Sequence, residues 1–150
     1  MKRRLTLAAG LLTLLMSGCA LHERMHEHMH GPGQADPANP KVLVKNGKLS
    51  VNLEPLRFSK ADGSVNITWH LPPGDVYAFA TNGIVVEPAV AGTKAARNVV
   101  DEFQCGPGKT PTEYTCLNRN TGPGKYKYTV RVLEKGVMLE PLDPFIINDF

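Results

Sequence analysis

Apolar and polar side chains alternate most regularly between residues 65 and 71. The apolar positions are Val65, Ile67, Trp69 and Leu71, and the positions between them are Asn66, Thr68 and His70. A period of two over this length is typical of a strand that is buried on one face. We therefore expect a strand that directs Trp69 into the core and His70 toward solvent.

Other short apolar runs, separated by turn residues, predict further strands. They lie at residues 41–51, 56–58, 76–80, 83–88, 98–103, 113–118, 126–134 and 143–149. After residue 40 no segment keeps helical periodicity over three turns, and residues 89–98 would hold one helical turn at most. The chain from residue 41 onward is therefore expected to be all-β.

Residues 41–51 contain an Asn46-Gly47 pair between two apolar arms. Both residues accept positive φ, which a type I′ hairpin turn requires. The hairpin would place Val44 beside Leu49, and Val42 beside Val51. In an alternative arrangement, only the second arm joins the main sheet.

About eight short strands over residues 41–150 favour an antiparallel β-sandwich. Two features resemble immunoglobulin-like domains: the inward Trp69 on a middle strand, and residues 122–130 (GPGKYKYTV), which are similar to the turn and penultimate strand of such domains. The resemblance implies that Tyr126 and Tyr128 belong to the core or its rim. Cys105 and Cys116 depart from the family pattern, because they are too close in sequence to be its widely separated inter-sheet cysteines.

The N-terminal residues 1–18 have the layout of a secretory signal peptide. Three basic residues precede an apolar run from Leu5 to Met16, which is too short to span a bilayer, since a spanning helix needs about 20 residues. The segment Leu15-Met16-Ser17-Gly18-Cys19 resembles the lipobox of bacterial lipoproteins.

The lipobox resemblance implies cleavage before Cys19, a diacylglycerol on its thiol and acylation of its amine. Ala20 after the cysteine is similar to the family's signal for delivery to the outer membrane, with the protein facing the periplasm. Two or more acyl chains would anchor the protein firmly to a membrane that it does not span. An ordinary signal peptide cut nearby, with an incidental thiol at Cys19, stays open as the alternative.

Residues 19–40 would form a tether between the anchor and the domain. Its first part, HERMHEHMH, holds four of the five histidines, and residues 31–40 are rich in proline and glycine. Imidazole suits copper, nickel and zinc, and thioether sulfur favours copper(I). The candidate ligands are His22, Met25, His26, His28, Met29 and His30. A plain polar spacer with incidental metal affinity, and a pH-responsive membrane contact, remain as alternatives.

Composition excludes some partners and narrows the role of the other cysteines. The chain has 17 basic and 14 acidic residues, and loss of residues 1–18 would remove three of the basic ones, leaving equal numbers. No basic stripe with interleaved aromatics points to nucleic acid. Cys105 and Cys116 form the remaining pair, and in an exported chain they most simply form a disulfide that braces a local hairpin or loop. A two-thiolate metal site is the alternative, but it would need ligands that the nearby sequence does not show.

The chain shows no motif of a known catalytic type, and the expected domain contains one histidine, His70. The acidic residues Asp101, Glu102 and Asp143 are weak support for acid–base chemistry without evidence of a pocket. We therefore expect a non-enzymatic binding or structural module of the cell envelope that requires no cofactor. It would bind an envelope protein or peptide through loops or an exposed strand edge. The second hypothesis is an envelope protein that handles copper, nickel or zinc through the tether.

Overall fold

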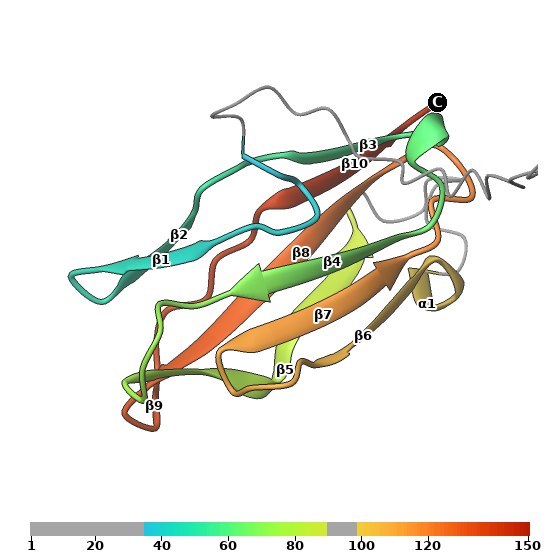
Figure 1. Cartoon of the computed structure of the whole chain (residues 1–150). Coiled ribbons are helices and arrows are strands. Elements are labelled where there is room, and N and C mark those ends of the chain that lie inside the picture. Colours follow the sequence, from blue (N-terminus) through green and yellow to red (C-terminus); the bar gives the residue numbers. More distant parts are fainter. Residues whose placement is uncertain (1–34, 90–98) are drawn as a thin grey trace, which may run out of the picture.

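β-Strands form most of the structure, a computed structural model that describes residues 35–89 and 99–150. The strands are β1 (Val42–Lys45), β2 (Lys48–Val51), β3 (Leu56–Ser59), β4 (Val65–His70), β5 (Tyr77–Pro88), β6 (Phe103–Pro107), β7 (Glu113–Asn118), β8 (Gly124–Glu134), β9 (Val137–Met138) and β10 (Phe145–Asp149) (Figure 1). A 3-10 turn spans Lys60–Asp62, and a short helix, α1, spans Val99–Glu102. No helix in these two described ranges is long and apolar enough to cross a bilayer.

The strands form three sheets. One has the order β3-β10-β8-β5 with β9 on β8, a second has the order β4-β7-β6, and β1 and β2 form a hairpin. The pairs between these strands are antiparallel except β10 with β3, which is parallel. The expectation of a purely antiparallel fold is wrong at this pair. Most of the domain separates β3 from β10 in sequence, and a connection of that length permits a parallel neighbour.

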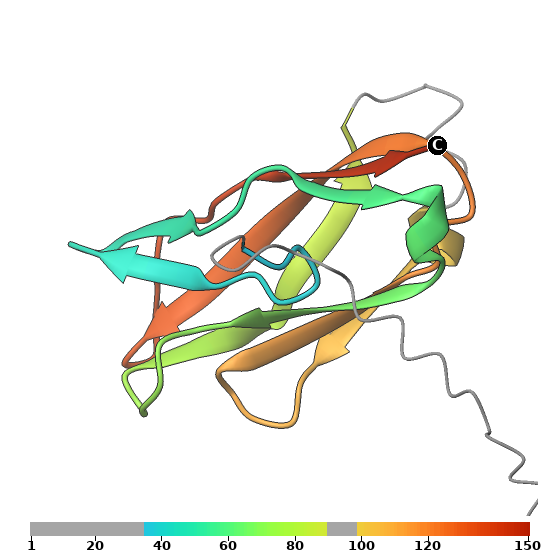
Figure 2. The same cartoon turned by 45° about the horizontal axis from the view of Figure 1, so that its top comes forward.

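The core lies between the two larger sheets, which Figure 2 shows as separate layers. Aromatic pairs join the layers, and Trp69 on β4 lies against Tyr128 on β8 with ring centroids 5.2 Å apart. Phe103 on β6 also packs against Tyr126 on β8, with ring centroids 4.8 Å apart. Trp69 and Tyr128 are both 0% exposed, which confirms that Trp69 points inward and that Tyr128 belongs to the core.

The hairpin β1–β2 forms as the Asn46-Gly47 pair predicts. Both residues have positive φ, 53° and 70°, and the register pairs Val44 with Leu49 and Val42 with Val51. Just before β1 the chain runs along the edge of β4, where the Thr68 N–H donates to the Ala38 carbonyl at 2.8 Å. The same edge is extended by an isolated parallel bridge between Lys41 and His70. One edge of the β4-β7-β6 sheet is therefore covered.

The two strands expected at 76–80 and 83–88 form one strand, β5. Its register against β8 shifts between Phe79 and Ile84, so the strand bends there without ending. Gly83 permits this bend, because a Cβ at that position would lie 2.8 Å from both Phe79 Cβ and Tyr114 Cδ2.

The prediction of a strand over residues 98–103 is wrong for residues 99–102, which form the helix α1. The side chain of Glu102 at its end is buried and bonded to another part of the chain, so long-range contacts override the local strand pattern. The helical turn expected within 89–98 lies, from residue 90 on, outside the described residues.

Candidate binding site

An apolar groove lies where the edge of β5 approaches the edge of β6. It has a volume of about 200 Å³ and is lined by Ile84, Val85, Val86, Val99, Val100, Phe103 and Cys105. Val100, on α1, is 81% exposed. Apolar side chains beside a sheet edge can receive the side chains of a strand that is added to that edge.

Within residues 35–89 and 99–150, no strand pairs with the β5 backbone at this edge. The Ala89 N–H donates to the Lys125 carbonyl at 3.2 Å, in register with the β5–β8 ladder. Hydrogen-bonded residues alternate along an antiparallel pair, so the peptide groups of Ile84, Val86 and Pro88 point away from β8. Among the described strands β5 lies at the edge of its sheet, so these groups face a side on which no described strand pairs.

β6 presents unpaired groups in the same way. The Gly108 N–H donates to the Glu113 carbonyl at 3.0 Å, which sets the alternation along the β6–β7 ladder. The peptide groups of Phe103, Cys105 and Pro107 therefore point away from β7. In the described parts of the chain, no strand pairs with the free side of β6. The groove thus has on each side a strand edge that pairs with no other strand of the described residues.

A disulfide braces β6 at the groove. Cys105 and Cys116 lie directly opposite each other on β6 and β7 and are joined with an S–S distance of 1.99 Å. Cys116 is 0% exposed, whereas Cys105 is exposed and lines the groove. The disulfide between neighbouring strands confirms the prediction that these cysteines brace a local hairpin. It gives no support to the alternative of a metal site with two thiolate ligands.

The buried carboxylate of Glu102 holds α1, which forms one wall of the groove. Its Oε1 accepts hydrogen bonds from the Thr121 N–H at 2.8 Å and from Asn148 Nδ2 at 3.1 Å, and its Oε2 accepts one from the Thr121 hydroxyl. Asn148 in turn exchanges two amide hydrogen bonds with Asn118, so α1 is tied to β10 and β7. Burial, and then the charge of Glu102, raise the pKa of Tyr126 above its ordinary value.

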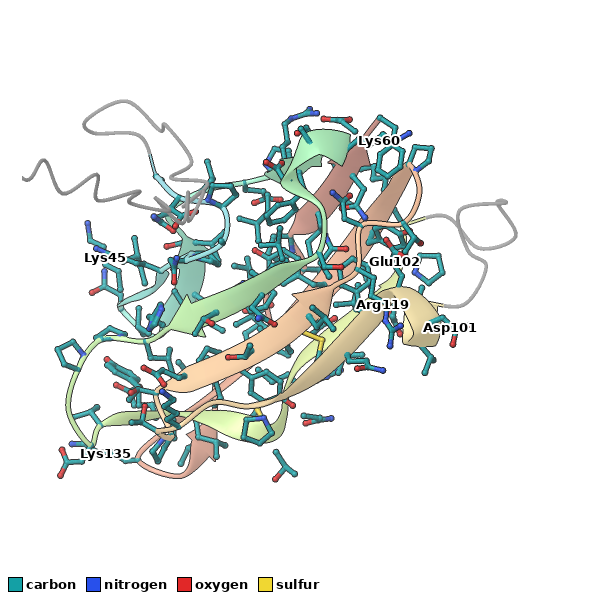
Figure 3. The ribbon with its side chains drawn as sticks, turned by 45° about the vertical axis from the view of Figure 1, so that its right-hand side comes forward. Lys45, Lys60, Asp101, Glu102, Arg119 and Lys135 are labelled. Atoms are coloured by element: carbon teal, nitrogen blue, oxygen red, sulfur yellow. A yellow bond between two sulfur atoms is a disulfide. The ribbon has the colours of Figure 1, made fainter. Side chains whose placement is uncertain are left out.

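The acidic residues considered from sequence do not form a catalytic pair. Glu102 is buried whereas its neighbour Asp101 is exposed, and Figure 3 shows both beside Arg119 at one end of the molecule. Asp143 lies elsewhere and accepts a hydrogen bond from the Thr129 hydroxyl at 2.7 Å. His70 lies on the face of β4 opposite Trp69, and its side chain is 37% exposed, as the alternation predicts.

The residues proposed for anchoring and for metal lie outside the described residues. They are Cys19, His22, Met25, His26, His28, Met29 and His30. Within residues 35–89 and 99–150 no three His, Cys, Asp or Glu side chains are grouped so as to hold a metal ion.

The groove itself was not apparent from the sequence. Its walls come from β5, α1 and β6, and only the run of valines at positions 85, 86, 99 and 100 hints at it. No protein-family model and no curated protein sequence matches this chain.

Proposed function

We propose that the protein is an exported lipoprotein, anchored through Cys19 to the outer membrane and facing the periplasm. Its immunoglobulin-like β-sandwich is a non-enzymatic module that binds an extended peptide segment of an envelope protein. The peptide adds as a strand in the groove between β5 and β6. The observation that carries this proposal is the pair of strand edges on either side of an apolar groove, neither of which pairs with another strand in the part of the chain that the structure describes.

The chemistry of the groove favours an extended peptide over a compact ligand. Outward peptide groups at every second residue match the hydrogen-bonding repeat of another strand. The apolar lining would receive side chains from alternate positions of that strand. Pro88 and Pro107 have no N–H group to donate and end the two edges, so only a short segment can pair.

The immunoglobulin-like assignment is supported by the two facing sheets and by Trp69 packed at the centre against the opposite layer. The disulfide within one sheet, rather than between sheets, is a departure from the antibody pattern. Fold alone does not fix function, so the proposal depends on the groove.

Two matched variants test the groove. Val100→Asp places a charge in the groove wall, and Val137→Asp places the same charge on β9, outside the groove. Both valines are exposed, at 81% and 69%, so neither change should unfold the domain. We expect Val100→Asp to weaken capture from a library of displayed hexapeptides by about tenfold or more, equivalent to about 1.4 kcal/mol.

The selected peptides should be apolar at alternate positions, and Val137→Asp should bind them as the native chain does. Equal binding by both variants would contradict the proposal. Concentration-dependent self-association that Val100→Asp abolishes, with no peptide selected, would assign the groove to a second copy of the chain instead.

Metal binding by the tether is a second candidate function, favoured by the concentration of four histidines and two methionines within residues 22–30. The metal would be copper, nickel or zinc, held outside the β domain. Calorimetric titration of a soluble form beginning at residue 19, compared with one carrying Ala at the four histidines, tests it. Equal weak binding by both forms would exclude a dedicated site.

A further inference from the structure

A polar hollow lies on the outer face of the sheet that contains β4, β7 and β6. It has a volume of about 510 Å³ and is lined by Asn39, Thr68, His70, Pro107, Gly108, Lys109, Glu113 and Thr115. These residues come from the segment before β1, from β4, from β7 and from the end of β6 and the turn that follows it. Its lining is polar and carries both signs of charge, so it differs in chemistry from the apolar groove between the strand edges.

The floor of the hollow can both donate and accept hydrogen bonds. Thr68 and Thr115 lie opposite each other on β4 and β7, with their hydroxyl oxygens 3.2 Å apart. One hydrogen bond between two hydroxyls uses one hydrogen, so the other remains available to a ligand. Gly106 pairs with Thr115 on the next strand, and a Cβ there would meet no atom within 4 Å, so this side of the floor is open.

The walls carry opposite charges that do not neutralise each other. The Glu113 carboxylate lies 3.8 Å from His70 Nδ1 and is 30% exposed. Lys109 is exposed, and within the described ranges it makes no ion pair, with Glu113 or any other residue. Lys41 is also exposed and adds a second cation nearby, because its backbone forms a β-bridge with His70 at the sheet edge.

Gly108 fixes the position of the turn that carries Lys109. Its N–H donates to the Glu113 carbonyl, and a Cβ at residue 108 would lie 2.5 Å from Glu113 Cβ. Only glycine permits this close approach without displacing Glu113. The turn and the backbone of Glu113 are therefore held in a fixed relation at the hollow.

We propose that this hollow binds a small zwitterion, namely an amino acid or a dipeptide that carries both an ammonium and a carboxylate group. Lys109 binds the carboxylate, Glu113 binds the ammonium, and the threonine hydroxyls bond the polar atoms between them. A simple anion would be repelled by Glu113, and a simple cation by Lys109. Among the described residues, no Trp, Tyr or Phe side chain lines the hollow to stack against a sugar ring. The site is open, so binding is expected to be weak, with a Kd of about 1 mM.

The test is a titration of amide chemical shifts in the soluble chain that begins at residue 19 with Cys19→Ala. The probes are alanyl-alanine, acetate, methylammonium and glucose. We expect alanyl-alanine to shift the amides of Thr68, His70 and Thr115 with saturation, and the other three probes to bind at least about tenfold more weakly. Lys109→Gln and Glu113→Gln should each weaken dipeptide binding by about tenfold.

Two controls separate this site from a general effect. Lys60→Gln removes an exposed lysine from the turn after β3, and Val100→Asp alters the groove, so both should leave dipeptide binding unchanged. Absence of any shift at about 50 mM dipeptide would overturn the proposal. So would acetate or glucose binding as well as the dipeptide, since either result would show that the paired charges do not select the ligand.

Discussion

At the scale of single residues, Glu102 fixes the position of the short helix α1, which it ends. Among the described residues, Glu102 is the one acidic or basic residue that is buried. A buried carboxylate is costly unless its oxygens are hydrogen-bonded, and both oxygens of Glu102 are. The bonds fix α1 against β10 and so hold Val99 and Val100 in the groove wall.

Replacing Glu102 by Ala should therefore destabilise the domain. The change leaves the Thr121 N–H without its acceptor and removes one of the two acceptors of Asn148 Nδ2, which keeps its bond to Asn118. A buried unsatisfied group costs about 1–3 kcal/mol. We expect the free energy of unfolding in urea to fall by about 2–4 kcal/mol with an unchanged m-value. Glu87→Ala is the control: it removes an exposed ion pair with Lys127, 3.6 Å long, and should cost less than about 1 kcal/mol. Equal losses would contradict the assigned role.

Residue-level prediction succeeds where the signal is local. The alternation through β4 assigns Trp69 inward and His70 outward, because side-chain direction in a strand follows from position alone. Glu102 gives no such signal, since its partners Thr121 and Asn148 lie 19 and 46 residues away. Its burial depends on the assembled sheets.

At the scale of elements, β6 is the strand most dependent on a covalent brace. It is short, it lies at an edge, and Cys105 joins it to the buried Cys116. A disulfide that closes a loop near this length stabilises by about 3 kcal/mol. We expect the double variant Cys105→Ser, Cys116→Ala to lose about 2–4 kcal/mol in urea unfolding and to lose peptide capture by the groove. Reduction of the native chain should lower the urea midpoint similarly, and an unchanged midpoint would contradict this.

Element boundaries were predictable where turn chemistry is explicit. Asn46-Gly47 defines the β1–β2 hairpin, and β7 occupies residues 113–118, as its apolar pattern indicates. Residues 76–80 and 83–88 are expected as two strands, but they belong to the single strand β5. The pairing with β8 resumes after the register shift, so the chain bends there within one strand.

At the scale of the whole molecule, the arrangement of strands separates two surfaces of different chemistry. The apolar groove opens at the edges of β5 and β6, whereas the polar hollow lies on the outer face of β4 and β7. The order β3-β10-β8-β5, with its parallel pair, could not be read from the sequence, because any of the predicted strands could occupy an edge. Since the surfaces depend on which strands are edges, they too were beyond sequence reasoning.

We expect membrane attachment to depend on the Cys19 thiol, which lies outside the β domain. Cys19→Ala removes the thiol that the lipobox resemblance assigns to the diacylglycerol, and with it the hydrophobic contribution of the acyl chains, about 0.8 kcal/mol per buried methylene. We expect the native chain in the membrane fraction with a mass increased by the lipid, and the variant in the soluble fraction. Deletion of residues 22–30 with Cys19 kept is the control, and it should leave both the membrane location and peptide capture unchanged. A Cys19→Ala protein that remains in the membrane fraction would show that something other than a lipid holds it there.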